Sequence, residues 1–244
     1  MIILPAIDLK GGVCVRLRQG RADDVTTYND DPAAQARDWR DQGGRELHVV
    51  DLDGAFAGTP RHSDVIRAII AAFGRPVEVG GGIRMPETLA SVLEAGATRA
   101  IIGSAALEDP AFLTRAVEQY GERVAVGIDA RDGFVQTRGW VTTTQVKAVD
   151  LARAVAEIGI KTIIYTDTAT DGMLGGPNLG QMAAICDAAP SCQITASGGV
   201  SSPRDVANLI ALARPNLRAA IVGKALYDGR TTLKEMNDAA GCNA

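Results

Sequence analysis

Residues 77–89 read VEVGGGIRMPETL, and residues 194–206 read ITASGGVSSPRDV. In each stretch a short apolar run leads into a Gly-Gly pair, and a proline shortly afterwards begins an amphipathic segment. Apolar runs of this length are typical of buried strands, and a proline at the first position is typical of a helix start. The same strand–turn–helix unit therefore occurs twice, separated by about half of the chain.

Three more pairs of similar segments follow the same order along the two halves. AIDLKGG (6–12) corresponds to GIDARDG (127–133). VVDLDGAFAGTP (49–60) corresponds to YTDTATDGMLGGP (165–177), and AIIGSAALEDP (100–110) corresponds to AIVGKALYDGR (220–230). Four collinear matches predict a twofold internal repeat of half-barrels, roughly 1–122 and 123–244. Because neither half would close its sheet alone and no linker separates them, we expect one domain over residues 1–244.

Short apolar runs rich in β-branched residues recur eight times, each continuously hydrophobic as a strand buried on both faces should be. They predict strands at residues 2–7, 47–50, 77–79, 100–102, 124–128, 162–165, 193–195 and 219–222. Amphipathic stretches between them predict helices at residues 32–42, 63–73, 86–94, 110–120, 150–158 and 203–213. This alternation within 244 residues, 46% of them hydrophobic, predicts an α/β fold, a single (β/α)8 TIM barrel, rather than an open doubly wound sheet.

The overall charge is slightly acidic, with a net charge of -4 and a pI near 5.3. Binding to a phosphate backbone requires a basic excess, so a nucleic-acid partner is not expected. The four cysteines are scattered without metal-ligand or disulfide spacing, which predicts reduced thiols and no metal site. The first residues, MIILPAID, lack a basic region and a long apolar stretch, so we expect neither a signal peptide nor a membrane span. These features together predict a cytoplasmic protein.

Glycines follow the third and fourth strands of each predicted half. Glycine at such a turn lets the backbone approach an anion closely, and the next helix start offers unpaired N–H groups. Barrels commonly hold phosphate in the loops after the last two strands, and the repeat places an equivalent pair of loops in the first half. We therefore predict two opposed phosphate sites, although a lone Gly-Gly pair is more often structural. The glycines are Gly81, Gly82, Gly103, Gly198, Gly199 and Gly223. Ser104, Ser197, Arg84 and Lys224 are possible extra donors, and for Arg84 and Lys224 the alternative is a solvated side chain.

Carboxylates stand at the ends of predicted strands, at Asp8, Asp51, Asp129 and Asp167, and Asp171 follows the sixth strand. Catalytic groups of barrels lie at this end of the strands, whereas aspartates there also cap turns through side-chain hydrogen bonds. The capping role is favoured for Asp51, and both roles stay open for the others. Asp8 and Asp171 come from opposite halves, so their carboxylates are placed to flank one ligand as an acid–base pair.

The remaining polar residues give weaker signals. His48 inside the second predicted strand and His62 after it show neither metal nor triad spacing, and strand packing is favoured for His48. Trp140 lies in the polar segment TRGW after the fifth strand, where it either stacks on a heterocycle or anchors the loop. Arg16 lies in VCVRLRQG (13–20), whose alternation predicts a hairpin over the barrel mouth, and it either reaches an anionic ligand or is solvated.

Across essentially the whole chain, the segments PAIDLKGG, VVDLDGA, VGGGIR, TDTATDGMLGGPN, ASGGV and AIVGKAL resemble the phosphoribosylformimino-aminoimidazole-carboxamide ribonucleotide isomerases of histidine biosynthesis. The resemblance implies an Amadori rearrangement, without metal or cofactor, of an aminoaldose that carries a phosphate at each end. It implies Asp8 as the general base at the sugar C2 and Asp171 as the general acid that opens the ribose ring. Asp129 and Thr166 match positions that assist near the reacting sugar, and Trp140 matches a tryptophan of a mobile loop that covers the substrate. The phosphate loops of the family match Gly81, Gly82, Gly103, Gly199 and Gly223.

Two related enzymes and one non-enzyme stay as alternatives. The cyclase that follows in the pathway typically has a cysteine where this chain has Ile7, and Gly-Tyr-Asp where it has Gly-Pro-Asn (176–178). A relative that also isomerises phosphoribosylanthranilate agrees at Arg16 and Arg138, but Gly80 matches the single-function enzyme, so a second activity stays open. A non-catalytic barrel that only binds phosphorylated ligands would be expected to lack one of the two aspartates. We therefore expect an enzyme that acts as a monomer on a small bisphosphorylated substrate, with no nucleic-acid or membrane partner.

Overall fold

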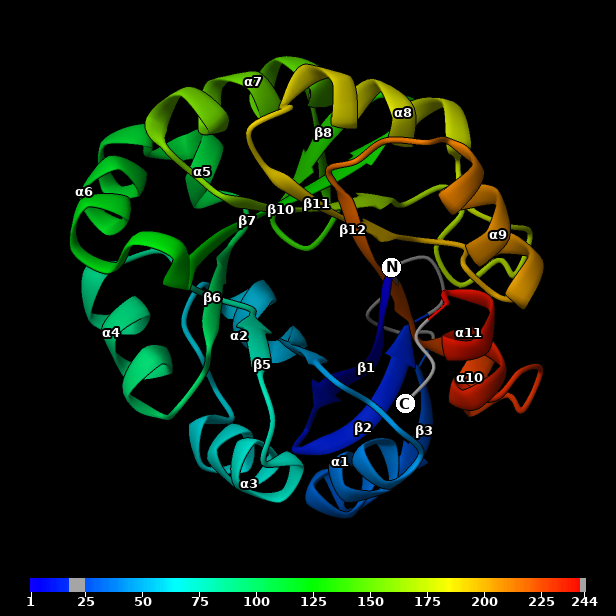
Figure 1. Ribbon diagram of the computed structural model, residues 1–244. Coiled ribbons are helices and arrows are strands. Elements are labelled where there is room, and N and C mark those ends of the chain that lie inside the picture. The colour runs from blue at the N-terminus through cyan, green and yellow to red at the C-terminus, as the bar shows by residue number, and fades with distance from the viewer. Residues whose placement is uncertain (18–24, 242–244) are drawn as a thin grey trace.

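The computed structural model of the protein describes residues 1–17 and 25–241, except for the side chains of Arg16 and Leu17. Eight parallel strands form the wall of a closed barrel, and helices surround it (Figure 1). The strands are β1 (Ile2–Lys10), β4 (Leu47–Asp51), β5 (Val77–Gly80), β6 (Arg99–Ile102), β7 (Val124–Arg131), β10 (Thr162–Asp167), β11 (Gln193–Ser197) and β12 (Leu217–Val222). The described part of the chain is therefore a (β/α)8 TIM barrel, and all eight predicted strands are confirmed.

Hydrogen bonds between neighbouring strands follow the chain order around the whole barrel. β1 pairs with β4 and β12, and β7 pairs with β10, so each of the eight parallel strands has a partner on both sides. Closure satisfies the N–H and C=O groups that an open parallel sheet would leave unpaired at its edges. It also brings the carboxyl ends of the eight strands to one rim, which is where ligand sites of barrels lie.

Apolar side chains form two cores, one outside and one inside the barrel wall. Between the wall and the helices, Phe73, Phe112 and Tyr165 are among the largest fully buried side chains. The smaller interior cluster consists of Leu4, Ala6, Ile101, Ala125, Ile164, Ala219 and Ile221. Alternate side chains of each strand face these two cores, which explains why the strands read as continuous hydrophobic runs.

The helices predicted from the sequence are present, three of them with the predicted bounds. They are α1 (Pro32–Asp41), α3 (Ser63–Phe73), α4 (Pro86–Glu94), α6 (Pro110–Tyr120), α7 (Ala148–Ile158) and α9 (Pro203–Ala211). Asp31, Asp109 and Ser202 accept backbone N–H groups at the starts of α1, α6 and α9, which defines where these helices begin. Additional helical segments are α2 (Leu52–Ala57), α5 (Ala105–Glu108), η1 (Gly121–Arg123), α8 (Leu179–Ala188), α10 (Lys224–Tyr227) and α11 (Leu233–Ala239). Within the described ranges, no helix combines the length and the apolar character needed to span a bilayer.

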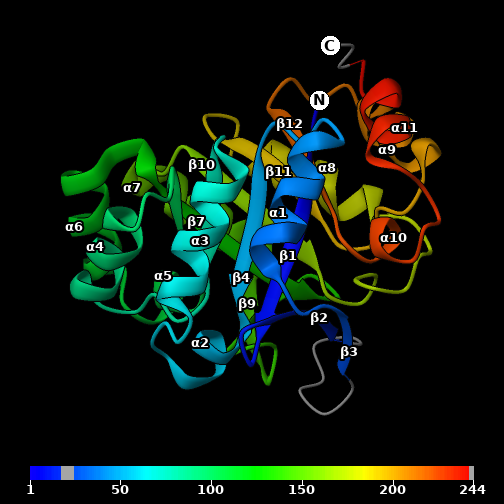
Figure 2. The ribbon, with the colours of Figure 1, turned by 90° about the horizontal axis from the view of Figure 1, so that it is seen from below.

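Two antiparallel hairpins extend the sheet at the mouth of the barrel. β2 (Val13–Leu17) pairs with β1 and with β3 (Val25–Asn29), which confirms the hairpin predicted after the first strand, although residues 18–20 of that segment lie outside the described part. β8 (Phe134–Thr137) and β9 (Thr142–Lys147) form a second hairpin where the sequence predicted only a polar loop. Figure 2 shows β2, β3, β9 and α2 at the same end of the barrel. Both hairpins therefore border the rim formed by the strand ends.

Candidate active site

The carboxyl ends of the strands surround a cavity at the mouth of the barrel. A smaller cavity lies beside it and shares Asp171 and Ser197 with the larger one. Every residue that the sequence predicted for the site lines one of these cavities, except Arg16, whose side chain lies outside the described part of the structure. Barrel closure therefore brings residues from both ends of the sequence into one region.

Three carboxylates reach the larger cavity from different parts of the barrel. Asp8 lies on β1, Asp129 lies on β7, and Asp171 lies in the turn after β10. Thr166 is the lateral neighbour of Asp129 in the register of β7 and β10, and its hydroxyl is hydrogen-bonded to the Asp129 carboxylate. The turn that carries Asp171 is closed by a hydrogen bond of 3.1 Å from the Asp171 backbone N–H to the carbonyl of Asp167. Carboxylates from both halves of the chain thus face a common cavity.

The surroundings of Asp129 favour its protonated form. Burial raises the pKa of this carboxyl, and the negative charge of Asp171 raises it further. Hydrogen bonds from Trp140 and Thr166 and the charge of His48 lower the pKa, but the net direction is upward. Asp129 therefore holds its proton to a higher pH than an exposed aspartate does. A carboxyl group with a raised pKa at the wall of a cavity is suited to acid–base chemistry.

The glycines after β5 and β6 serve two different purposes. Gly81 has a φ of 109°, and a Cβ there would lie 2.2 Å from the carbonyl oxygen of Asp51. A Cβ on Gly82 would lie 2.6 Å from the carbonyl oxygen of Gly54, so both positions exclude a side chain. Gly103, after β6, would place a Cβ with no heavy atom within 4 Å, and this residue borders the cavity. Gly81 and Gly82 therefore shape the turn, whereas Gly103 leaves space for a ligand.

The turn after β11 has a similar arrangement. Gly198 has a φ of 92°, and a Cβ there would lie 2.4 Å from the carbonyl oxygen of Asp167. The ammonium of Lys224, at the start of α10, is paired with the carboxylate of Asp228 one helical turn later and is half-buried. The predicted residues that line the smaller cavity are Asp171, Ser197, Gly198, Gly199, Gly223 and Lys224. This cavity combines backbone N–H groups of a glycine turn with a cation, which is suited to an anion.

The tip of the β8–β9 hairpin lies against the first glycine loops. Arg138, Gly139 and Trp140 have φ values of 58°, 68° and 68°, a left-handed conformation that is unfavourable for arginine and tryptophan. The backbone N–H of Arg138 donates to Oγ of Ser104 at 2.8 Å. A Cβ on Gly139 would lie 2.7 Å from the ring of Phe56, so the glycine allows close contact with α2. Contacts with Ser104 and with Phe56 of α2 thus hold the strained hairpin tip in place.

Trp140 and Arg84 are the two largest predicted site residues at the mouth. Trp140 is partly buried, lines the larger cavity, and is hydrogen-bonded through its side chain to Asp129. Trp140 reaches the cavity because the hairpin folds its tip over it. Arg84 also lines the cavity, and its guanidinium donates to the carbonyl oxygen of Ala55 on α2 at 3.1 Å. Both side chains are positioned by hydrogen bonds at the cavity wall.

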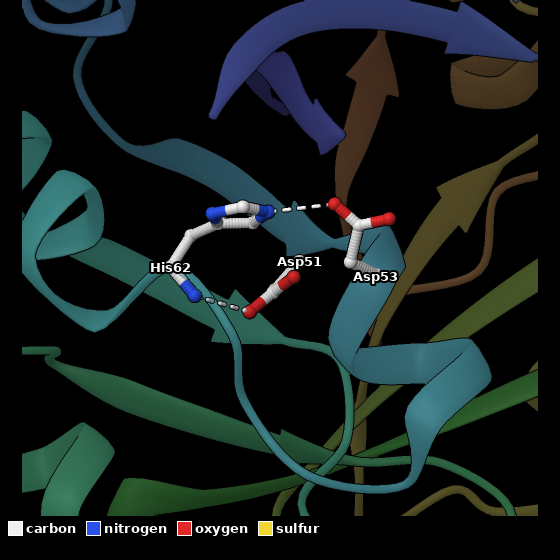
Figure 3. A group of neighbouring side chains, drawn as sticks. All are labelled: Asp51, Asp53 and His62. Carbon is white, nitrogen blue, oxygen red and sulfur yellow. Dashed lines mark hydrogen bonds and ion pairs between the residues drawn. The ribbon is translucent and has the colours of Figure 1, made fainter. Parts of the chain in front are cut away.

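Asp51, the last residue of β4, has a structural role, as favoured from the sequence. Its fully buried carboxylate accepts the backbone N–H groups of Gly54, Arg61 and His62 at 2.8, 2.6 and 3.0 Å. His62 is also paired through Nε2 with Asp53 at 2.7 Å (Figure 3). Ligand atoms of Asp51, Asp53 and His62 lie within 4.8 Å of one another, a spacing compatible with a metal ion. The oxygens of Asp51 and Asp53 already accept hydrogen bonds, and Nε2 of His62 is engaged with Asp53, so the group fastens the loop after β4.

Some residues that line the larger cavity were missed in the sequence. His48 was assigned to strand packing, and Phe56 attracted no attention, yet both side chains line the cavity. His48 shares a strand face with Val50, which also lines the cavity, but the alternation of side chains along a strand does not by itself say which face is inside. Other lining residues not singled out are Ala6, Val50, Leu52, Ala55, Ile83, Ile101, Gly127, Gly139, Ile164 and Ile221.

Comparison with known proteins places this barrel in a family. A relative from Syntrophotalea carbinolica is 50% identical over 235 residues, and one from Moorella thermoacetica is 51% identical over 237 residues, with 96% of each chain covered in both cases. A relative from Acinetobacter baylyi is 47% identical over 236 residues, again with 96% coverage of each chain. All three are named 1-(5-phosphoribosyl)-5-((5-phosphoribosylamino)methylideneamino)imidazole-4-carboxamide isomerase. The family model described as "Histidine biosynthesis protein" matches residues 2–232. This chain therefore belongs to the histidine biosynthesis protein family.

Proposed function

We propose that this chain is an aldose–ketose isomerase that converts N-(5-phosphoribosylformimino)-aminoimidazole carboxamide ribonucleotide into its phosphoribulosyl form. Its curated relatives carry the name of this activity. The observation that carries the proposal is that Asp8 and Asp171, from opposite halves of the chain, line one cavity that adjoins both sets of glycine loops. A substrate with a phosphate at each end and a reacting sugar between them fits this arrangement.

The two carboxyl groups are assigned to the two proton transfers of the Amadori rearrangement. Asp171 donates a proton to the ring oxygen of the ribose as the bond from this oxygen to C1 breaks and the nitrogen lone pair forms a C=N bond. Asp8 removes the proton from C2, which gives an enaminol. The hydroxyl proton on C2 then leaves while C1 gains a proton, and the product is the aminoketose. Each transfer by a positioned acid or base contributes typically about 10²- to 10⁴-fold to the rate.

Asp129, Thr166 and Trp140 are assigned to support of the reacting sugar. The hydrogen bonds from Trp140 and Thr166 to Asp129 support this assignment, because Asp129 lies at the wall of the cavity. The upward direction of the Asp129 pKa further supports a role near the proton transfers. Trp140 is assigned as a lid over the substrate, and the left-handed backbone of its hairpin tip, a strained conformation often found at functional sites, supports this assignment.

The two phosphates are assigned to the two glycine-loop sets. One phosphate would lie at Gly103 and Ser104 beside the turn of Gly81 and Gly82, with Arg84 nearby. The other would lie in the smaller cavity, whose residues are Ser197, Gly198, Gly199, Gly223 and Lys224. Glycine turns and helix starts supply the N–H donors, and the two cations add charge. Arg16 stays assigned to the anionic substrate on the basis of the sequence alone.

We infer that the barrel is built from two half-barrels, roughly residues 1–122 and 123–244, joined in a single domain. Support comes from Gly81 and Gly198, each of which approaches the carbonyl of an aspartate that ends the neighbouring strand. Six pairs of matching positions line the larger cavity together: Ala6 and Gly127, Asp8 and Asp129, His48 and Ile164, Val50 and Thr166, Gly80 and Ser197, and Ile101 and Ile221. An approximate twofold relation between the halves would produce such pairs.

The partners we propose are limited to the small bisphosphorylated substrate. A net charge of -4 gives no general attraction for nucleic acid, and the proposed reaction uses no metal or cofactor. We infer a monomer in the cytoplasm. The cysteines described in the structure, Cys14, Cys186 and Cys192, are buried thiols, as expected in a reducing compartment.

The proposed function is tested with the aminoaldose substrate and the purified protein, without added metal, by the absorbance change on isomerisation. Asp8→Asn and Asp171→Asn should each lower kcat by about 10²- to 10⁴-fold because each removes a proton carrier. Asp53→Asn is the matched control, since Asp53 lies at the same end of the barrel but does not line either cavity. We expect this control to keep activity within a few-fold of wild type. Wild-type rates in both cavity variants would refute the assignment.

A second activity on phosphoribosylanthranilate is tested by complementation of growth. Arg138, the residue that agrees with the dual-function relative, lies at the hairpin tip over the cavity, and its backbone N–H is bonded to Ser104. Growth rescue of histidine-requiring and tryptophan-requiring strains, side by side, separates the two activities. Rescue of the histidine requirement alone would establish the single-function enzyme.

A further inference from the structure

The interior of the barrel below the larger cavity contains a network of partly buried ion pairs around two glutamates. Glu46, which directly precedes β4, pairs with Arg99 of β6 and Arg218 of β12. Glu78 of β5 pairs with Arg99 at 3.3 Å and with His48 of β4 at 2.8 Å. The side chains of Glu78 and Glu46 are 1% and 10% exposed. The network thus links four strands and ends at His48.

The matching positions of the second half carry no charge. In the alignment of the two halves, the counterparts of His48, Glu78 and Arg99 are Ile164, Thr195 and Ala219. Ile164 and Ala219 belong to the apolar cluster that fills the barrel interior. Removal of charges from water is costly, and replacing buried ion pairs by apolar side chains is often neutral or stabilising. Since Ile164 and Ala219 fill the matching places with apolar side chains, packing alone does not account for the polar and charged groups at His48 and Arg99.

His48 is the point at which this network meets the cavity. Its side chain is 12% exposed and lines the larger cavity together with Asp8 and Asp129. Among the residues that the structure describes, Glu78 is the hydrogen-bond partner of the ring, through Nδ1. Because Glu78 is buried, the exposed edge of the ring, with Nε2, is the edge toward the cavity. The register of β1 and β4 places His48 beside Ala6, two residues before Asp8.

We propose that His48 is a substrate-orienting residue whose Nε2 forms a hydrogen bond with a ribose hydroxyl at the deep end of the cavity. The inference rests on the proposed function, because it requires the sugar to lie between the two phosphate loops. The Glu78 carboxylate accepts a hydrogen bond from the N–H group at Nδ1 and thereby selects the tautomer of the ring. Nε2 then accepts a hydrogen bond when the ring is neutral and donates one when the ring is charged. A hydroxyl group both donates and accepts hydrogen bonds, so it fits Nε2 of the neutral ring and of the charged ring. An unprotonated phosphate oxygen only accepts, so it fits the charged ring alone.

Two amide variants separate the functions of the two ring nitrogens. His48→Asn keeps a polar group near the position of Nδ1, beside Glu78, and removes the group at Nε2. His48→Gln extends its amide to the position of Nε2. We expect His48→Asn to lose about 10- to 100-fold in kcat/KM for the aminoaldose, the range for a lost hydrogen bond that leaves its partner unsatisfied. His48→Gln should recover most of this loss. Both variants should bind inorganic phosphate as the wild type does, because the glycine loops are unchanged.

His62→Gln is the matched control for these variants. His62 is also paired with a carboxylate, at 2.7 Å, and its side chain is 17% exposed, but it lines neither cavity. It should keep the kcat/KM of the wild type.

Wild-type kcat/KM in His48→Asn, or equal losses in His48→Asn and His48→Gln with normal phosphate binding, would overturn the proposal. If His48→Asn does not fold, His48→Gln tests the proposal instead. Near wild-type turnover of His48→Gln would support the proposal, and a tenfold or larger loss would overturn it. This threshold is the lower end of the range of about 10- to 100-fold for a lost hydrogen bond. No turnover by the wild-type protein would refute the proposed function and, with it, this inference.

Discussion

The replacement Gly81→Ala tests the packing of the first glycine turn. The φ of 109° places this residue in a region that costs an L-amino acid about 1–2 kcal/mol. The new Cβ would lie 2.2 Å from the carbonyl oxygen of Asp51 and 2.8 Å from its backbone nitrogen. Backbone atoms cannot move aside as a flexible side chain does, and overpacking of this kind costs about 1–3 kcal/mol. We therefore expect the free energy of unfolding to fall by about 2–5 kcal/mol.

This loss is large compared with the stability of about 5–15 kcal/mol that is usual for a domain. In a chain of this size it corresponds to a decrease in Tm of roughly 4–20 °C. Gly103→Ala is the control, because its Cβ would meet no heavy atom within 4 Å, and we expect its stability to stay within about 0.5 kcal/mol of wild type. Urea and thermal unfolding followed by circular dichroism measure both variants. Equal unfolding midpoints for Gly81→Ala and Gly103→Ala would refute the reasoning.

Three other results are expected. Gly103→Ala should weaken the binding of inorganic phosphate by about tenfold in calorimetry, since its methyl group enters the space assigned to phosphate and removes about one hydrogen bond to a charged group; an unchanged Kd would argue against that assignment. Asp129→Asn should be more stable than wild type at pH 7, and this advantage should disappear below the unfolded pKa of 3.8. The sign follows because a folded-state pKa above the unfolded value makes stability fall as pH rises between the two values; a variant destabilised equally at both pH values would contradict it. Burial raises the pKa of Cys14 to about 12 and of Cys186 to about 11, so in a Cys242→Ser background iodoacetamide should modify these thiols at pH 8 only after unfolding. Rapid modification of the native protein, measured by mass spectrometry, would contradict the buried positions.

The sequence by itself determined the architecture and the residues at the rim. All eight strands were recognisable because a strand that is buried on both faces is a short, uninterrupted apolar run. The helices that begin at Ser63, Pro86 and Pro110 were predicted with their observed bounds, since prolines and capping residues act locally. Asp8, Asp171 and the loop glycines were found because the ends of strands and the turns that follow them lie at one end of any parallel barrel.

Only the tertiary structure decided which side chains face the cavity and which loops cover it. Strands that are apolar on both faces carry no alternation, so the sequence of β4 does not say whether His48 faces the helices or the barrel interior. The register with β1 and β5 decides this, because it places His48 between Ala6 and Glu78. The β8–β9 hairpin was read as a loop for a similar reason. Its tip is held by Ser104 and Phe56, which are far away in sequence and become neighbours only when the barrel closes.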